Sequence, residues 1–337
     1  MNALARRSIW ALALFCPWAS AFRATATAQQ PAPPADQRPR PAPPVATSTQ
    51  IAIGGATLQV DFAPGSFDLP TEIILNHIRA ATAAVTAYYG RFPVTHACIR
   101  VVPVAGESGI VQGTTWGSMR GFQGFTRLRI GQHTTTQDLA EDWTTTHELV
   151  HMAFPSLPDD QHWMEEGLAT YIEPLARVQT GELQARQVWH DMVRGMPQGE
   201  PRPGDQGLDR THTWARTYWG GALFCLTADV EIRRATGNRK GLRDALRAVV
   251  AAGGTIDNDW DIGQALDIGD RATGTHVLTQ MYAAWKDAPV SVDLPKLWAE
   301  LGIVTTNNDA VDFKSDAPLA AVRKSIASDR TAQPSRP

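Results

Sequence analysis

Two histidines in the segment HELVH, residues 147–151, have the types and the spacing of a metal site. In an α-helix, positions i and i+4 lie one turn apart on the same face, so His147 and His151 can hold one ion from one side. Glu148 is rotated by about a quarter turn from His147 and therefore points beside such an ion, where a general base belongs. Trp143, at helical spacing from His147, is expected to pack this helix against the core.

The segment HWMEEGLATYIE, residues 162–173, offers a third ligand. It is typical of a second helix, capped by Asp159 or Asp160, that a short connection lets turn back against the first. Glu165 and Glu166 are about 100° apart on such a helix, so only one of them can face the ion. The pattern by itself does not select between the two.

Two further side chains on the second helix have open roles. His162 lies one turn before Glu166 on the same face and is a rival ligand, a wall of the pocket or a solvated histidine. Glu173 lies seven residues after Glu166 on that face. It either orients a metal-bound histidine or is a solvated carboxylate.

Zinc is the ion that this donor set favours. Three protein ligands leave a fourth position for water and lower the pKa of that water to about 7, so that a nearby carboxylate can take its proton. The pattern therefore predicts one zinc ion per chain, hydrolytic chemistry and Glu148 as the base. A helix that carries histidine without function is the weaker interpretation.

Composition describes a globular protein that is not a nucleic-acid binder. The chain has 337 residues, of which 43% are hydrophobic and 19% charged, so it can bury a sizeable core in one large domain or two lobes. Its net charge is -3, and no run of Lys or Arg is long enough for binding to nucleic acid.

The N-terminus has the layout of a secretory signal peptide over residues 1–28. Arg6 and Arg7 precede an apolar stretch at 9–22, and small residues follow. A membrane-spanning helix needs about 20 apolar residues, and this stretch is shorter and interrupted by Pro17. We therefore expect a secreted or periplasmic protein without a stable membrane span, rather than a buried N-terminal helix.

The order of predicted elements indicates an α+β fold in which a mixed β-sheet lobe precedes a mainly helical lobe. A Pro-rich linker at 29–48 leads into a catalytic domain at 49–305. Its β-rich lobe spans 49–133 and its α-rich lobe spans 134–305. Residues 306–337 are poor in apolar residues and are expected to be an unstructured tail.

Periodicity and glycine placement give the expected elements inside these lobes. Strands are predicted at 51–63 and 96–104, a helix at 70–90, and a hairpin or sheet edge at 109–131. Further helices are predicted near 136–154, 159–173, 182–195, 214–235 and 241–252.

Cys98 and Cys225 are the cysteines that remain once the signal segment is set aside. They could form a disulfide in an oxidising compartment or remain two buried free thiols. Neither is expected to be catalytic, because no helix start or neighbouring cation would lower the pKa of its thiol.

HELVH followed by WMEEGLATYIE resembles the gluzincin metallopeptidases, whose third ligand is the glutamate of a Trp-x-x-Glu-Gly element. The resemblance selects Glu166 as the third ligand. The segment TYWGGALFCLTADVEIRRATGNRKGLRDALRAV, residues 217–249, is similar to the glycyl aminopeptidase family and, more distantly, to aminopeptidase N. These matches cover roughly residues 113–250 and imply a thermolysin-like zincin catalytic domain.

The resemblance also implies that the hydroxyl of Tyr218 stabilises the tetrahedral intermediate. A phenol donor aimed at a developing oxyanion is a physically sound stabiliser of the transition state. Gly220 and Gly221 would let their helix approach the site closely. Asp229 and Arg233, an i, i+4 pair, are expected to form a structural ion pair.

One motif departs from these families. Their aminopeptidases carry a Gly-x-x-Glu strand motif whose glutamate binds the substrate's free amine, and the nearest counterpart here is GSMRG, residues 117–121, with Arg120 in place of the acid. Because a guanidinium repels an ammonium, we expect blocked peptides to be cut at least as well as free ones. Alternatively, Arg120 points to solvent and another acid, such as Glu107 or Glu165, binds the amine.

The sequence thus predicts a zinc-dependent peptidase that acts on peptides or proteins. Two other functions stay open at this stage. One is a binding protein on a peptidase fold that has lost its activity, and the other is a zinc hydrolase of a non-peptide amide.

Overall fold

The structure is a computed structural model, and it describes residues 44–306 and 310–328. The predicted signal peptide lies outside the described residues, as does most of the predicted linker. Within the two described ranges, none of the helices is both long and apolar enough to cross a membrane.

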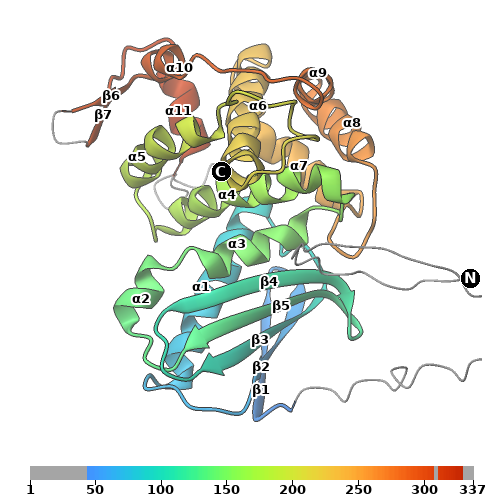
Figure 1. The fold of residues 1–337 in the computed structure, drawn as a ribbon, viewed down its shortest axis with the longest axis vertical. Helices are drawn as coiled ribbons and strands as arrows, with labels where there is room; N and C mark the ends of the chain where they lie inside the picture. Colours follow the sequence, from blue (N-terminus) through green and yellow to red (C-terminus); the bar gives the residue numbers. More distant parts are fainter. Residues whose placement is uncertain (1–43, 307–309, 329–337) are drawn as a thin grey trace, which may run out of the picture. The chain divides into compact units, whose positions relative to one another are not determined.

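A five-stranded mixed sheet forms the first lobe (Figure 1). Its strands lie in the order β1-β2-β3-β5-β4, with antiparallel pairing at both ends and parallel pairing of β2 with β3 and of β3 with β5. The bounds of these strands are β1 Thr47–Ile53, β2 Ala56–Phe62, β3 His96–Val104, β4 Ile110–Met119 and β5 Phe122–Gly131. The predicted hairpin at 109–131 is thus confirmed, and β4 lies at the edge of the sheet.

The strand predicted over residues 51–63 is interrupted by a chain reversal. Gly54 and Gly55 have φ values of 57° and 83°, and the strands on either side pair with each other. Two successive left-handed residues make the tight hairpin turn that best matches the twist of paired strands, and glycine adopts this conformation without strain. The alternation of apolar residues continues through the turn, so it did not reveal the reversal.

Helix α1, Thr71–Tyr89, connects the sheet to the helical part of the molecule. As predicted, Pro70 precedes it and Gly90 ends it in the left-handed conformation, which suits glycine. Its buried side chains include Ile74 and Ile78, which have no exposed surface. The helix joins β2 to β3 and also contacts α3 and α4, so one core runs through both lobes.

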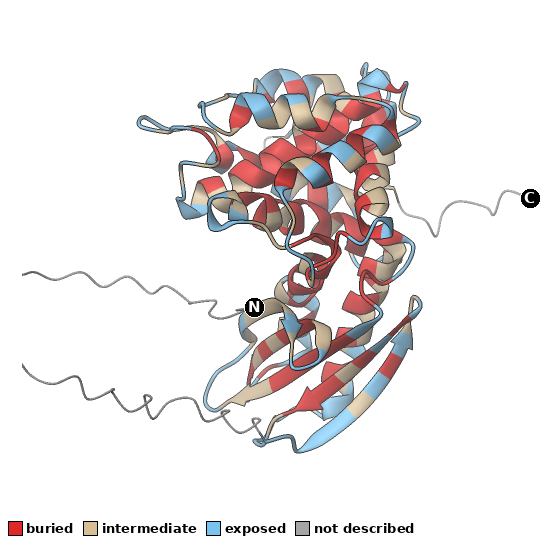
Figure 2. Cartoon of the chain, turned by 90° about the vertical axis from the view of Figure 1, so that its right-hand side faces the viewer, coloured by how far each residue is buried: buried red, intermediate tan, exposed pale blue. Residues whose placement is uncertain are grey.

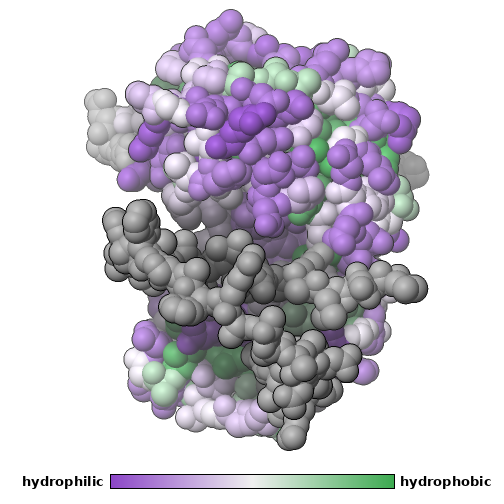
Figure 3. All heavy atoms as spheres, turned by 45° about the vertical axis from the view of Figure 1, so that its right-hand side comes forward, coloured by the Kyte–Doolittle hydropathy of each residue, from purple (hydrophilic) through white to green (hydrophobic). Residues whose placement is uncertain are grey.

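After β5, the described residues form helices, the loops that connect them and the two-stranded sheet of β6, Ile303–Thr305, and β7, Val311–Phe313. The helices are α2 Thr136–Glu141, α3 Thr144–Val150, α4 His162–Thr180, α5 Ala185–Gly195, α6 Gly221–Ala235, α7 Leu242–Ala251, α8 Ile262–Thr273, α9 Val277–Trp285, α10 Leu294–Leu301 and α11 Ala320–Ile326. Buried residues gather where these helices pack (Figure 2), and much of their outward surface in Figure 3 is hydrophilic. The predicted α+β arrangement, a mixed sheet followed by a helical lobe, is confirmed.

The single helix predicted near residues 136–154 is wrong, because the chain breaks it at Asp142. This residue is extended, with φ -67° and ψ 128°, and ends α2. Its carboxylate accepts hydrogen bonds from the backbone N–H groups of Thr144 and Thr145, at 2.8 and 3.1 Å. An aspartate that bonds the backbone two and three residues ahead starts a new helix, and α3 begins at Thr144.

The unstructured tail predicted from residue 306 is also wrong for residues 310–328. This part of the chain contains β7 and α11, and it buries Val311, Val322 and Ile326. The guanidinium of Arg323 donates hydrogen bonds to the carbonyl groups of Leu301 and Gly302. Few apolar residues are enough here because they lie on one face and cover the end of α10.

Both cysteines are buried free thiols, which resolves the alternative left open by the sequence. Burial, followed by the nearby charge of Asp61, raises the pKa of Cys98 to about 12. Burial likewise raises the pKa of Cys225 well above its usual range. At neutral pH both side chains are therefore uncharged and act as small apolar groups.

Helices α4 and α6 approach each other closely at a pair of glycines. A methyl group added to Gly167 would overlap the backbone of Gly221, and one added to Gly221 would overlap the carbonyl group of Trp163. Gly221 thus lets α6 approach α4 at Gly167, whereas Gly220 and Gly221 were expected to bring their helix close to the candidate metal site itself.

This contact makes Gly167→Ala a test of the helix packing. The added methyl group forces α4 and α6 apart, and we expect a loss of about 1–3 kcal/mol in the free energy of unfolding, measured by urea denaturation. Thr170→Ala, one turn along the same helix and half-buried, is the control and should change stability much less. Equal stability of Gly167→Ala and the wild type would contradict the packing.

Candidate metal centre

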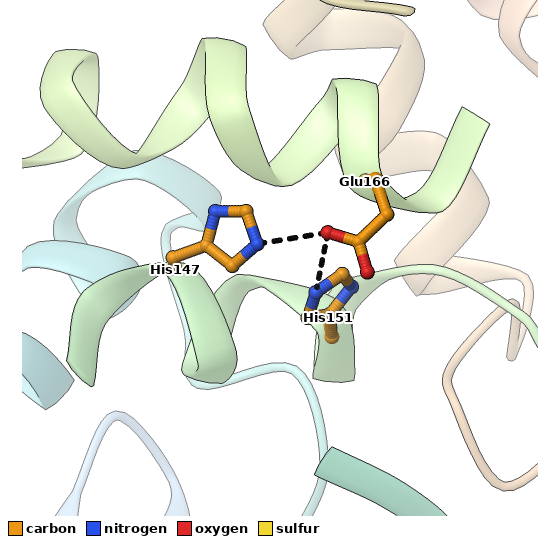
Figure 4. A group of neighbouring side chains, drawn as sticks. All are labelled: His147, His151 and Glu166. Atoms are coloured by element: carbon orange, nitrogen blue, oxygen red, sulfur yellow. Dashed lines mark hydrogen bonds and ion pairs between the residues drawn. The ribbon is translucent and has the colours of Figure 1, made fainter. Parts of the chain in front are cut away.

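Three side chains converge on one point (Figure 4): one from α3, one from the short 3-10 turn His151–Ala153 that follows it, and one from α4. His147, His151 and Glu166 each offer one ligand atom, and these atoms all lie within 4.8 Å of one another. The Oε2 of Glu166 lies 3.0 Å from the Nε2 of His147 and 3.6 Å from the Nε2 of His151. The predicted helix pair thus brings together the three residues expected to be ligands.

The donor set and its spacing fit a zinc ion. Zinc lies about 2.0–2.1 Å from its nitrogen and oxygen ligands, so neighbouring ligand atoms around a tetrahedral ion are about 3.3–3.4 Å apart. The two measured separations, 3.0 and 3.6 Å, bracket that value. His147 and Glu166 are buried, and His151 is nearly so, which keeps competing water away from the site.

Glu165 and His162 lie beside the triad but outside it. One oxygen of Glu165 lies 2.9 Å from the Nδ1 of His162, and the other accepts a hydrogen bond from the backbone N–H of Leu157. The Nε2 of His162 lies 3.1 Å from the second oxygen of Glu166, and half of the His162 side chain is exposed. Of the roles considered for His162, this geometry matches a wall of the pocket.

Electrostatics keep the Glu166 carboxylate charged. Burial by itself would raise the pKa of Glu166, but the charge of His151 and hydrogen bonds with the surrounding histidines outweigh it and hold this pKa far below the usual range. For His151, burial lowers the pKa, and the nearby carboxylates, chiefly Glu166, raise it to about 9. Without a metal, the Glu166 carboxylate is therefore paired with a protonated His151, and a bound cation would take the place of that proton.

Glu148 extends from α3 toward the edge strand β4 rather than into the triad. The hydroxyl of Thr115 donates a hydrogen bond of 2.8 Å to its Oε2 and also contacts its backbone carbonyl oxygen at 2.9 Å. Gly113 lies against the Glu148 side chain, which a Cβ at that position would overlap. The sequence reasoning missed Thr115 and Gly113, although a glycine inside a predicted strand is a signal of close approach.

Tyr218 lies on a short π-helical turn, Arg216–Gly220, that leads into α6. Its ring stacks on that of His147 with 6.1 Å between the centroids. Burial and the neighbouring Glu166 carboxylate raise the pKa of Tyr218 well above its usual range, so its hydroxyl keeps its proton. A π-turn of this kind is often found at functional sites, because it re-aims one side chain within a helix.

The stacked rings of His147 and Tyr218 each contact the ring of an exposed tryptophan. Trp143 makes an edge contact with His147 at 5.2 Å, and Trp214 stacks on Tyr218 at 5.4 Å. Their exposed fractions are 53% and 62%. The expectation that Trp143 packs into the core is therefore wrong, because the break before α3 turns its side chain outward.

Glu173 does not support a metal ligand. Its carboxylate pairs with Arg177 at 3.0 Å, and burial raises its pKa to about 7 despite that partner. Glu173 is also buried, so neither of the two roles considered for it, orienting a metal-bound histidine or being a solvated carboxylate, describes it, and the Nδ1 of His147 is buried without a hydrogen-bond partner among the described residues. The predicted pair of Asp229 with Arg233 does form, with 2.8 Å between the atoms.

Arg120 lies away from the candidate metal centre, so its predicted place in the substrate site is wrong. It occupies the turn between β4 and β5, and its guanidinium lies 5.9 Å from the ring of Phe125. Gly113 and Thr115 on β4 face Glu148, whereas Trp116 and Phe125 line a cavity with Arg120. Motif position alone could not show which face of the sheet each residue occupies.

Comparisons with known proteins identify the fold but no family. No family model matches the sequence, and no curated protein matches it. An aminopeptidase N family protein from Idiomarina loihiensis superposes with a TM-score of 0.56 at 13% identity, over 81% of this chain and 53% of that chain. An M1 zinc metallopeptidase from Deinococcus radiodurans gives a TM-score of 0.46 at 17% identity, over 74% of this chain and 52% of that chain.

The likeness to the Idiomarina protein shows a shared fold, with a mixed sheet and a helical lobe. The chain spans about half the length of each of these solved structures. The comparison does not single out the glycyl aminopeptidase family that the sequence resembles most closely.

The orientation of α4 predicts which of its two adjacent glutamates, Glu165 or Glu166, is needed to bind the metal ion. Glu166→Gln removes the charged oxygen shared by both histidines, so zinc affinity should fall by more than the roughly 10–100-fold typical of losing a supporting residue. Glu165→Gln, the control, should lose much less. Zinc content after dialysis against a graded series of chelator concentrations measures both, and a site emptied by Glu165→Gln instead would contradict this orientation.

Proposed function

We propose that this chain is a zinc-dependent peptidase in which His147, His151 and Glu166 hold one zinc ion. The observation that carries the proposal is the convergence of two imidazoles and one ionised carboxylate, with a fourth polar group, Glu148, fixed beside them. A metal site that only stabilises a fold rarely needs a carboxylate base beside the metal ligands. The arrangement is the one expected of a gluzincin, and the shared fold supports it.

A zinc ion in this site would act as a Lewis acid that makes water a nucleophile at neutral pH. Glu148 takes the proton of the attacking water and later gives it to the leaving amine. The hydrogen bond from Thr115 holds the Glu148 carboxylate in one orientation. Tyr218, which keeps its proton, donates a hydrogen bond to the oxygen that becomes negative in the transition state.

Peptides and proteins are the proposed substrates, cut away from their termini. Strand β4 has no Asp or Glu between Ile110 and Met119, so it offers no carboxylate to a free N-terminal amine. The exposed rings of Trp143 and Trp214 offer apolar surfaces beside the metal ligands. Together these features favour an internal peptide segment with large apolar side chains.

The proposed location of this activity is outside the cytoplasm, in the periplasm or the medium. This part of the proposal rests on the sequence of residues 1–28 alone, with its charged, apolar and small-residue segments in that order.

Glu148→Gln tests the proposed base. Glutamine keeps the shape of the side chain and cannot accept a proton, so hydrolysis of a mixed peptide library should fall by about 100-fold or more while zinc stays bound. Glu165→Gln is again the matched control and should retain activity. Undiminished hydrolysis by Glu148→Gln would remove Glu148 from the mechanism, and absence of chelator-sensitive hydrolysis in the wild type would overturn the proposed function.

A peptide series with free and acetylated N-termini tests the cleavage position. Because β4 carries no acid for the amine, acetylated peptides with a central Phe or Leu should be cut at least as well as their free counterparts, with kcat/KM as the measurement. Strict dependence on a free amine would contradict this and direct attention to Glu165, the carboxylate nearest to the triad on α4.

A further inference from the structure

We propose that the outer face of the five-stranded sheet binds a short acidic peptide segment. This face holds a cavity of about 600 Å³, a volume within the range of about 300–1,000 Å³ typical of ligand sites. Arginines and apolar side chains line the cavity, and no acidic residue does: Pro44, Ala63, Pro64, Arg100, Val102, Trp116, Met119, Arg120, Phe125, Arg127 and Arg129. The proposal does not rest on the zinc chemistry.

The pleat of the sheet separates this cavity from the metal centre. Successive side chains of a strand point to opposite faces, and Thr115 on β4 points to Glu148. Trp116 therefore points to the outer face, where its register partner on β5 is Phe125. Arg127 follows Phe125 at a spacing of two residues and shares its face. One side of the sheet thus carries the aromatic floor and the cations together.

Positive charge on this face is only partly offset: Asp61 lies beside Arg100 on the neighbouring strand, and Arg100 and Arg129 donate hydrogen bonds to the Pro44 carbonyl oxygen and to Gln112. Arg100 on β3 and Arg127 on β5 are direct register partners, and like charges at such positions repel each other. None of the four arginines forms an ion pair within the described part of the chain. Asp61, the partner of Arg100 on β2, instead accepts hydrogen bonds from Ser48 and Gln59.

Arg127 is the centre of the site. Its guanidinium lies 5.2 Å from the ring of Trp116, which fixes the plane of the group. Its Nε is buried and has no hydrogen-bond partner among the described residues. A buried donor without an acceptor is costly, and Arg127, which lines the cavity, offers its guanidinium to a carboxylate bound there.

Arg120, which lines the cavity, has a strained backbone conformation. It forms a tight turn with Gly121, and its φ is 56°, a left-handed conformation that favours Gly or Asn over Arg. The turn holds its guanidinium over Phe125, at 5.9 Å from the ring, on the rim of the cavity. Backbone strain of this kind often accompanies a binding function.

The spacing of the arginines on β5 favours an extended peptide as the ligand. Arg127 and Arg129 are two residues apart on one strand, so their Cα atoms are about 6.6 Å apart. Alternate residues of an extended peptide have the same spacing, so Asp or Glu at positions i and i+2 can meet both guanidinium groups. A nucleic acid fits less well, because the chain has a net charge of -3 and only four arginines line the cavity.

Fluorescence anisotropy with a labelled peptide, Glu-Phe-Glu-Phe-Glu, tests the site on the full chain carrying Glu148→Gln, which prevents cleavage. We expect saturable binding that weakens as salt is added, and no binding of the peptide in which Gln replaces every Glu. Arg127→Gln should weaken binding at least tenfold. Arg120→Gly should weaken it while raising thermal stability, because glycine relieves the left-handed strain.

Arg271→Gln, on the helical lobe and exposed, is the control and should bind like the parent. Equal binding of the Gln peptide, or full binding by both Arg127→Gln and Arg120→Gly, would overturn the proposal. So would tighter binding of an oligothymidylate or of inorganic phosphate in the same cavity, because either result would assign the site to a different ligand class. These outcomes are independent of peptidase activity, because the assay measures binding to the Glu148→Gln chain.

Discussion

The position of one carboxylate oxygen organises the helical lobe. The Oε2 of Glu166 lies within 3.6 Å of imidazole nitrogens of both His147 and His151, so the approach of α4 to α3 is fixed by that contact. About 100° around α4 from Glu166, the helix rests on α6 through Gly167 and Gly221, where no side chain separates the two backbones. The turn before α6 carries Tyr218, so the same packing that places a ligand places the phenol.

Two buried carboxylates of the helical lobe are balanced by arginine partners. Asp229 pairs with Arg233, and Glu173 pairs with Arg177, both within helices. Glu166 differs because its partners are imidazoles, which can exchange protons for a metal ion at an accessible pH. A cluster with the same negative charge but arginine partners could not make that exchange, since arginine keeps its proton.

The sheet divides two chemical environments that the sequence places side by side. Thr115 and Trp116 are neighbours in the chain, yet Thr115 contacts Glu148 of α3 and Trp116 lines a cavity that also contains four arginines. A change of register by one residue would exchange these faces. This alternation is the reason why Arg120, close in sequence to the residues of the metal centre, lies on the other side of the sheet.

The sequence by itself predicted the three residues of the candidate metal centre and the order of the lobes. HELVH carries its ligands at a helical spacing that any local helix preserves, and glycines and prolines mark the ends of α1. The tertiary structure decided the rest. It turned Trp143 outward, buried Glu173 and brought Thr115 to Glu148. These outcomes depend on which elements pack together and on which face of a strand is covered, and local spacing contains neither kind of information.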